Sequence, residues 1–288
     1  MRSSVINYLG PRGSYSYEVA LNYIKEKHIS PFELQAFSTI AKMFEMKDYE
    51  PNSLIIVPLE NSTSGDVYET YKHLYNTQFR IVACQTLEIK NSLIAIEGAT
   101  IDDIEKIYSH PQALMQVSTF LENNNIIGMP YYSTAESVNF ISEQNDKSLA
   151  AIASRQNAEY FSNTVVIDSK VNNNEANYTR FLVLSLEKNS SPYQICIDDD
   201  LTNGSNLFLL FELAADGAGQ LSNLLSLLSA YNINLNNIKS RPIEGEKFNY
   251  FFIAEADISN ITEREMHNQL ATELKRFTKK YAYNVYSK

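Results

Sequence analysis

Short apolar runs alternate with helical patterns along the first part of the chain, and this alternation restricts the possible folds more than any other feature. Residues 5–9 have the pattern of a strand, and the turn Gly10-Pro11-Arg12-Gly13 separates them from a helical pattern at 14–27. Further strand patterns lie at 53–58, 80–96 (two strands), 106–108, 126–131, 149–152 and 164–167, with helical patterns at 67–75, 111–122, 134–144 and 155–161. This alternation is typical of βαβ units, so we expect open, largely parallel sheets.

A polar stretch interrupts the alternation at residues 188–204, where Asn, Ser and Asp gather. We interpret it as a linker between a first domain, 1–187, and a second domain, 205–288. The second domain has strand patterns at 205–213, 235–241, 248–257 and 281–286, and helical patterns at 221–231 and 263–279. The resulting order, βαββαβ, is the ferredoxin-like arrangement.

Charge and composition exclude several classes of protein. The net charge is −10, so neither nucleic acid nor an anionic membrane surface is an expected partner. No apolar run is long enough to span a membrane, and the start of the chain lacks the apolar core of a signal peptide, so we expect a cytoplasmic protein. Cys84 and Cys196 are far apart in the sequence and belong to no Cys/His cluster. We expect both thiols to be buried and reduced, and we expect no metal site.

Two polar motifs follow strand patterns directly, where open α/β sheets bind ligands. In the first, glycines and hydroxyls at a helix start offer donors to an anion, although an ordinary turn with a helix N-cap also explains them. In the second, a carboxylate, an amide and a hydroxyl follow a buried strand, although an Asx turn is an alternative. The residues that we expect to face a ligand are Gly13, Ser14, Ser16, Glu60, Asn61 and Ser62.

A third motif, Ser109-His110-Pro111-Gln112, begins the helical pattern at 111–122. Pro111 fits the first turn of a helix, with Ser109 as its N-cap. Gln112 and Gln116 lie one turn apart on the face opposite the apolar stripe, and Ser109 lies on the same side. These side chains could form one wall of a site, but a solvated helix face explains the pattern equally well. We expect His110 to be structural.

The fourth motif lies in a strand pattern at 177–183. Alternation along a strand places Thr179 and Phe181 on one face and Arg180 on the other. Taken alone, this pattern indicates that Thr179 is an ordinary β-branched strand residue.

Taken together, these segments resemble the prephenate dehydratase family. The sequences Y-L-G-P-R-G-S-Y-S, V-P-L-E-N-S, S-H-P-Q-A and T-R-F-L-V-L occur in that family in this order and at about these spacings. The later stretch I-N-L-N-N-I-K-S-R-P resembles part of the ACT regulatory module that follows the catalytic part of these enzymes. The resemblance implies a carbon–oxygen lyase that converts prephenate to phenylpyruvate with loss of water and carbon dioxide, on the route to phenylalanine.

The resemblance also implies the architecture and the roles of the site residues. It implies an α/β fold, with a two-lobed periplasmic-binding-protein-like catalytic domain that holds the site in a cleft, and a ferredoxin-like ACT domain. No cofactor is implied, because formation of the aromatic ring drives the elimination. Thr179 matches the residue that assists departure of the ring hydroxyl. The other residues that it assigns to the substrate are Asn61, Ser109 and Gln116 for orientation, Arg180 for a carboxylate, Glu60 as an acid or a positioning group, and Gly13, Ser14, Ser16, Ser62, Gln112 and Phe181 for binding.

The resemblance also implies that phenylalanine regulates the enzyme and binds where two ACT copies meet. It therefore implies a homodimer or homotetramer. The residues that correspond to the effector site are Gly219, Gln220, Leu221, Asn234, Lys239, Ser240, Arg241 and Pro242. Gln220 is bulkier than the usual alanine, and Lys239 reverses the charge of the usual glutamate. Two alternatives stay open: a non-catalytic two-lobed sensor of small molecules, and a dehydratase that acts on arogenate.

Overall fold

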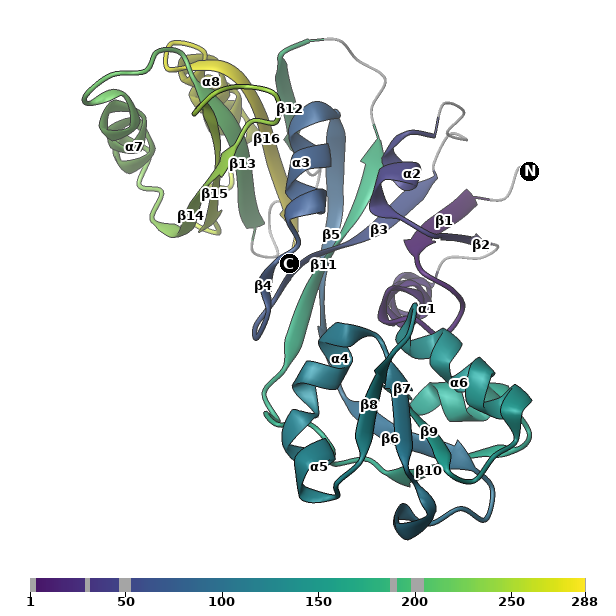
Figure 1. Ribbon diagram of the computed structural model, residues 1–288. Helices are drawn as coiled ribbons and strands as arrows, with labels where there is room; N and C mark the ends of the chain where they lie inside the picture. The colour runs from purple at the N-terminus through teal and green to yellow at the C-terminus, as the bar shows by residue number, and fades with distance from the viewer. Residues whose placement is uncertain (1–3, 29–31, 47–52, 187–190, 198–204, 288) are drawn as a thin grey trace. The chain divides into compact units, whose positions relative to one another are not determined.

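The computed structural model describes residues 4–28, 32–46, 53–186, 191–197 and 205–287 (Figure 1). Its strands are β1 (Ser4–Leu9), β2 (Phe32–Phe37), β3 (Leu54–Asn61), β4 (Gly65–Asp66), β5 (Phe79–Glu88), β6 (Asn91–Ile96), β7 (Lys106–Ser109), β8 (Ile127–Pro130), β9 (Leu149–Ser154), β10 (Thr164–Asp168), β11 (Tyr178–Leu186), β12 (Tyr193–Ile197), β13 (Ser205–Leu213), β14 (Leu235–Pro242), β15 (Tyr250–Asp257) and β16 (Thr278–Ser287). Its α-helices are α1 (Tyr15–Lys27), α2 (Ile40–Phe44), α3 (Tyr68–Asn76), α4 (Pro111–Gln116), α5 (Ser118–Asn123), α6 (Thr134–Gln144), α7 (Gln220–Ala230) and α8 (Arg264–Leu274), and two 3₁₀ helices are η1 (Ile101–Asp103) and η2 (Arg155–Tyr160).

The first sheet has the strand order β2-β1-β3-β11-β5, with the short strand β4 paired to β3. Strand β3 is central, and its run from Leu54 to Val57 is buried. The strand continues beyond the predicted 53–58 as far as Asn61, so the second motif forms its end. Strand β2 and helix α2 were not expected from the sequence.

The second sheet has the order β10-β6-β9-β7-β8. Strand β7 runs parallel to β8 and β9, whereas β6 runs antiparallel to β9 and β10. The expectation of a largely parallel sheet is therefore wrong here. Helices α4, α5 and α6 connect β7, β8 and β9, and such crossovers keep strands parallel. Strand β6 follows β5 after a short connection, and no crossover helix fixes its direction.

The helical pattern at 111–122 forms two helices, α4 and α5, instead of the single helix predicted. The break lies at Val117, whose φ and ψ are −121° and 16°. Asn173 causes it, because its backbone N–H donates to the Gln116 carbonyl at 2.7 Å, its Oδ1 accepts from the Thr119 N–H at 3.0 Å and its Nδ2 donates to the Met115 carbonyl at 2.9 Å. In a continuous helix the Thr119 N–H would donate to the Met115 carbonyl, and the Gln116 carbonyl would accept from the N–H of Phe120. The pattern predicted at 155–161 is the 3₁₀ helix η2.

The third sheet has the order β12-β16-β13-β15-β14, and β13-α7-β14-β15-α8-β16 confirms the predicted βαββαβ order. Leucines from both helices are buried against the sheet, among them Leu224, Leu228, Leu270 and Leu274. Strand β12 lies within the predicted linker and pairs in parallel with β16. Part of that stretch is therefore a strand, and its residues 188–190 and 198–204 lie outside the described residues.

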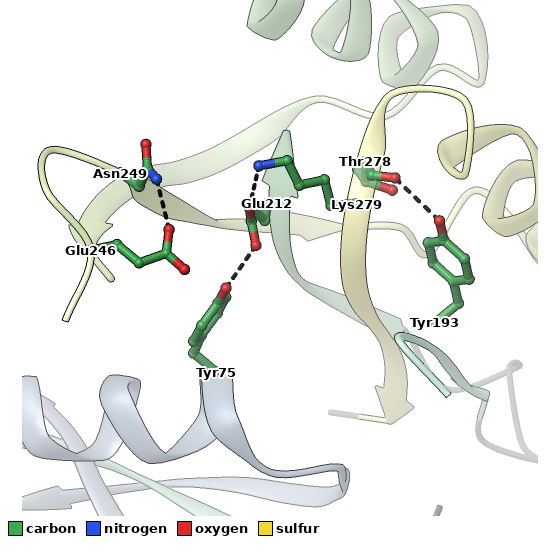
Figure 2. Close-up of polar contacts among 7 residues, drawn as sticks. All are labelled: Tyr75, Tyr193, Glu212, Glu246, Asn249, Thr278 and Lys279. Carbon is green, nitrogen blue, oxygen red and sulfur yellow. Dashed lines mark hydrogen bonds and ion pairs between the residues drawn. The ribbon is translucent and has the colours of Figure 1, made fainter. Parts of the chain in front are cut away.

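Contacts divide the chain into two units: residues 1–43, 56–66 and 85–181, and residues 44–55, 67–84 and 182–288. Helix α3 thus belongs with the third sheet, where Tyr75 stacks on Phe251 with ring centroids 4.6 Å apart. In Figure 2, Glu212 accepts the Tyr75 hydroxyl at 2.7 Å and pairs with Lys279 at 2.9 Å. The domain boundaries at 187 and 205 stay a prediction. No helix in the described ranges has the length and apolar character needed to cross a membrane.

Candidate functional site

Asn61 ends strand β3, and a tight turn after the strand determines the direction of its side-chain amide. Its Oδ1 accepts the backbone N–H groups of Thr63 at 3.0 Å and Ser64 at 2.9 Å, and also the Ser64 hydroxyl at 3.0 Å. A backbone N–H can only donate, so the amide oxygen of Asn61 must face this turn. The NH₂ group of Asn61 therefore points the other way.

The Asn61 NH₂ group points toward strand β11. It lies 2.9 Å from the Thr179 Oγ1, 2.7 Å from the Asn177 Oδ1 and 3.1 Å from the Tyr178 carbonyl oxygen. Because Asn61 donates, the Thr179 hydroxyl accepts and keeps its own hydrogen for another partner. Within the described ranges no group accepts that hydrogen. Thr179 is 8% exposed, so the site contains a nearly buried hydroxyl whose hydrogen is available to a ligand.

Glu60 and Arg180, next to Asn61 and Thr179 in the sequence, form an ion pair. The Arg180 Nε lies 2.8 Å from the Glu60 Oε1, and about a quarter of each side chain is exposed, 29% and 27% respectively. The sequence assigned separate roles to these two residues, and the structure brings them together. The pairing neutralises an isolated carboxylate that would repel an anionic ligand.

The third motif differs from expectation at its first residue. His110, not Ser109, caps α4, because the His110 Nδ1 accepts the Gln112 N–H at 3.3 Å. Partial desolvation of the ring lowers the pKa of His110, which favours the neutral ring that this bond requires. Ser109 is fully buried, and its hydroxyl donates to the Ile152 carbonyl at 2.6 Å, which ties β7 to β9. The predicted wall of Ser109, Gln112 and Gln116 therefore does not include the Ser109 hydroxyl.

The two glutamines of α4 contact different partners. The Gln112 Nε2 donates to the Ser64 Oγ at 2.7 Å, which joins the third motif to the turn after β3. The Gln116 Oε1 accepts from the Asn91 Nδ2 at 3.1 Å. Asn91 is fully buried at the start of β6, and sequence reasoning missed it. Its sequence signal is a polar residue at the head of the apolar run Asn91–Ile96.

The first motif packs tightly against η2. Gly13 has a φ of +90°, and an added Cβ would collide with Asn157. The Asn157 Nδ2 donates to the Gly13 carbonyl at 2.9 Å, a contact that the sequence did not predict. Ser14 is the N-cap of α1, where its Oγ accepts the Tyr17 N–H at 3.2 Å and donates to the Leu9 carbonyl at 2.8 Å. The N-cap alternative for this hydroxyl is thus confirmed, while Ser16 is buried within α1.

Hydrogen bonds connect all four motifs. One path runs from Thr179 through Asn61 and Ser64 to Gln112 in α4, and a second runs from Gln116, at the other end of α4, through Asn91 to Tyr15. The groups on both paths are amides and hydroxyls, which suit recognition of an anion by neutral donors. Ser62 supports the same region through the Tyr178 N–H, which its Oγ accepts at 2.9 Å, and Phe181 lies in the core.

Cysteines and acidic clusters add no further centre in the described ranges. No group of three or more His, Cys, Asp or Glu side chains lies there in an arrangement that could hold a metal ion. Cys84 and Cys196 are half-buried, so the expectation of buried thiols is wrong.

The candidate effector residues lie in the second unit, at the start of α7 and along β14. Gly219, with a φ of +86°, precedes α7, which begins with Gln220 and Leu221, and Asn234 is exposed just before β14. Exposure alternates along β14, so Lys239 and Arg241 share the half-buried face and Ser240 and Pro242 share the exposed one. The Lys239 Nζ and the Arg241 Cζ lie 5.9 Å and 5.6 Å from the ring centroid of Tyr71 in α3.

Comparison with known proteins identifies the family. The family model described as prephenate dehydratase matches residues 6–189. The prephenate dehydratase of Lactococcus lactis is 31% identical over 252 residues, which cover 86% of this chain and 84% of that protein. Among solved structures, prephenate dehydratase from Arthrobacter aurescens in complex with L-Phe has a TM-score of 0.81 at 23% identity and covers 99% of this chain and 90% of that one.

A second solved structure shows that the fold alone does not determine the activity. A protein described as a novel type of quorum-quenching acylase has a TM-score of 0.76 at 23% identity and covers 98% of this chain and 97% of its own. Assignment therefore depends on the family match and the residues of the site. The match covers more than half of the chain, including all four motifs, and the chain belongs to the prephenate dehydratase family.

Proposed function

We propose that this chain is a prephenate dehydratase, a carbon–oxygen lyase that produces phenylpyruvate, water and carbon dioxide on the route to phenylalanine. Family membership supports the reaction, and the Thr179 hydroxyl is the observation that carries the mechanism. That hydroxyl accepts from Asn61 at 2.9 Å and therefore has its hydrogen available for a departing oxygen. The cytoplasm is the location that we propose for this enzyme.

The reaction needs little from the protein beyond binding and a donor. The bond between the ring and its carboxylate breaks and releases carbon dioxide, and the electron pair of that bond enters the ring. The ring hydroxyl then leaves with its bonding electrons and takes up one proton to become water. Thr179 donates a hydrogen bond or proton to this oxygen as the charge develops. No cofactor is needed, because formation of the aromatic ring provides the driving force.

The neutral donors suit the remaining task, which is to hold a dianion. We assign Gln112, Gln116 and Ser62 to orientation of the substrate, with the backbone around Gly13 and the first turn of α1 as further donors. We assign Asn61 to orientation of the Thr179 hydroxyl, because both ends of its buried amide bond within the protein. The Arg180 guanidinium is the cation closest to Thr179 in the sequence and supports a substrate carboxylate while Glu60 positions it. A direct role for Ser109 has little support, since its buried hydroxyl bonds to Ile152.

We also propose the finer architecture that the resemblance implies. The first and second sheets would be the two lobes of the catalytic domain, a proposal supported by the bond between Ser64 after β3 and Gln112 in α4. The βαββαβ region would be an ACT-type domain that binds phenylalanine where two copies of the chain meet, in a homodimer or homotetramer. Its residues for the effector are those at the start of α7 and along β14.

The test is turnover by the purified full-length chain. Incubation with prephenate at neutral pH should produce phenylpyruvate, measured by its ultraviolet absorbance against a reaction without enzyme. Incubation with arogenate should produce phenylalanine only if the alternative substrate is accepted. Binding of prephenate without turnover would support a non-catalytic sensor instead and would overturn the proposal.

A further inference from the structure

We propose that Asn91 is a positioning residue that turns the side-chain amide of Gln116 so that its NH₂ group faces the substrate. This inference rests on the proposed function, because it gives Gln116 the role of a donor to prephenate. Asn91 lies in none of the four motifs, and its side chain acts only through Gln116. The series of hydrogen bonds that holds Asn91 begins at a backbone carbonyl, which can only accept, and it therefore has a defined direction.

The series begins at the Ile89 carbonyl, which can only accept. The Asn172 Nδ2 donates to it at 3.1 Å, so the Asn172 Oδ1 must be the atom that faces Asn91. The Asn91 atom 2.9 Å from that oxygen must then be its Nδ2. The backbone carbonyl of Ile89 thus determines which end of the buried Asn91 amide is the oxygen and which is the NH₂ group.

The same Nδ2 of Asn91 lies 3.1 Å from Gln116, so the Gln116 atom there must be its oxygen, Oε1. The other side of the Asn91 amide is satisfied by Tyr15, whose hydroxyl donates to the Asn91 Oδ1 at 2.9 Å. Burial raises the pKa of Tyr15, which keeps this hydroxyl protonated and able to donate. The Gln116 NH₂ group consequently points away from Asn91, and within the described ranges no group accepts from it.

This direction matters for an anionic substrate. A Gln116 amide turned the other way would present its carbonyl oxygen, which repels a carboxylate. Asn91 is fully buried, so a misdirected partner there would stay unsatisfied without help from water. The arrangement therefore holds Gln116 in the one orientation that offers two N–H donors before the substrate arrives.

Asn91→Asp is the main test, because it keeps the shape of the side chain and removes its donors. The ionised carboxylate would attract the Gln116 NH₂ group and turn the amide, so we expect kcat/KM for prephenate to fall about 10- to 100-fold near neutral pH. Burial raises the pKa of a carboxyl group, so the introduced side chain becomes protonated as the pH is lowered. The O–H of the protonated carboxyl could again donate to the Gln116 Oε1. The loss relative to the unsubstituted enzyme should therefore shrink as the pH is lowered toward about 5.

Two comparisons separate this role from a structural one. Asn163 also makes three side-chain hydrogen bonds, at 2.7, 2.9 and 3.2 Å, with Ser142 and Asn145, so Asn163→Asp is a matched control that should leave kcat/KM and its pH profile unchanged. In a Gln116→Ala background, Asn91→Asp should cause no further loss, because its effect requires the Gln116 amide. An equal loss with and without Gln116, or a pH profile parallel to that of the unsubstituted enzyme, would overturn the proposal.

Two further measurements keep the proposal testable if Asn91→Asp does not fold. Tyr15→Phe removes the hydroxyl that holds Asn91, and we expect a loss of about threefold that also disappears in the Gln116→Ala background. The side-chain amide signals of Gln116 in a ¹⁵N–¹H spectrum should shift in Tyr15→Phe or Asn91→Asp, whether or not the enzyme turns over prephenate. Unchanged signals would contradict the inference, whereas missing turnover in the unsubstituted chain would contradict only the proposed function.

Discussion

Two polar regions of the molecule are built from different chemical groups. In the first unit, hydrogen bonds run between amides and hydroxyls that carry no charge. Asn61, Asn91 and Thr179 are buried, and Gln116 is half-buried. In the second unit, α3 contacts the third sheet and the loop after β14 through charges and aromatic rings. Lys72, for example, pairs with Glu244 of that loop at 2.6 Å. Both regions connect segments far apart in the sequence, but they respond to different conditions.

The neutral region owes its directionality to backbone groups, which neither titrate nor change partners with salt. Each amide there has one orientation, and so each free donor has one direction. The charged region depends on protonation, and its exposed members are screened by salt. We therefore expect substitutions in the neutral region to change catalysis strongly, and substitutions in the charged region to change stability and regulation modestly.

The largest effect should come from Thr179→Ala, which removes the free donor. Loss of a group that assists proton transfer costs about 10²- to 10⁴-fold, so kcat for prephenate should fall by that range while the fold is retained. Thr179→Ser keeps the hydroxyl and should retain partial activity. Steady-state kinetics would measure kcat, and circular dichroism would check folding. If the folded Thr179→Ala enzyme has a kcat within about threefold of the unsubstituted one, Thr179 has no part in the mechanism.

Asn61→Asp should have the next largest effect, because it introduces charge into the neutral region. The introduced carboxylate could not donate to Thr179, and the Thr179 hydroxyl would donate to that carboxylate instead of the substrate. We expect kcat to fall about 10²-fold, with a smaller rise in KM from repulsion of the dianion. The same change at Asn163, outside these paths, should leave kcat unaltered. Comparable losses at both positions would show that the direction of the Asn61 amide is unimportant.

These directions could not be predicted from the sequence, although most elements could. Apolar periodicity located the strands and the βαββαβ order, because burial of one face is a local property of the sequence. The break between α4 and α5 was missed because Asn173, a residue far along the chain, takes the backbone bonds of Gln116 and Met115. Strand direction in the second sheet was also missed, since β6 has no crossover helix to define it.

The site residues show the same difference between features that depend on neighbouring residues and features that depend on residues far along the sequence. Motif spacing identified Asn61, Thr179, Gln112 and Gln116, and the structure joins them through hydrogen bonds. Asn91 and Asn157 were missed because an amide that contacts a residue 25 or 144 positions away leaves no periodic signal. Ser109 was placed as the N-cap of α4 from Pro111, but its side chain satisfies a neighbouring strand and His110 takes the cap.

In the charged region, Lys239→Glu tests whether the reversed charge weakens regulation. We expect phenylalanine at millimolar concentration to inhibit the unsubstituted enzyme. A ligand held by Ser240 would lie on the face of β14 opposite Lys239, so the substitution should change the affinity for phenylalanine by less than about threefold. Loss of the contact with the Tyr71 ring should lower the free energy of unfolding by about 1 kcal/mol.

Titration calorimetry with phenylalanine and urea denaturation would check both parts of this prediction. A tenfold gain in affinity would place Lys239 against the ligand instead. No binding or inhibition by millimolar phenylalanine in the unsubstituted enzyme would refute the regulatory proposal. The full-length chain is the right material, since removal of residues beyond 187 would uncover Tyr75 and the rest of α3 from the third sheet.

The smallest effect should come from Glu212→Gln, which removes one charge from the second unit (Figure 2). Burial raises the pKa of Glu212, but hydrogen bonds from Lys279 and Tyr75 and the nearby lysine charges outweigh it, so the pKa is lowered overall.

Stabilisation by the pair of Glu212 and Lys279 is therefore fully present above the unfolded pKa of about 4.3, and it is lost as the pH falls through the lower folded value. The variant should lose about 0.5 kcal/mol in urea denaturation at pH 7, less in high salt, and progressively less as the pH falls below about 4.3. Glu246→Gln, a matched change at a carboxylate that accepts from Asn249 at 2.7 Å, is the control for loss of a carboxylate from the same unit. A constant difference between Glu212→Gln and the unsubstituted chain from pH 7 to pH 3 would mean that the hydrogen bond to Tyr75, and not the charge, stabilises this contact.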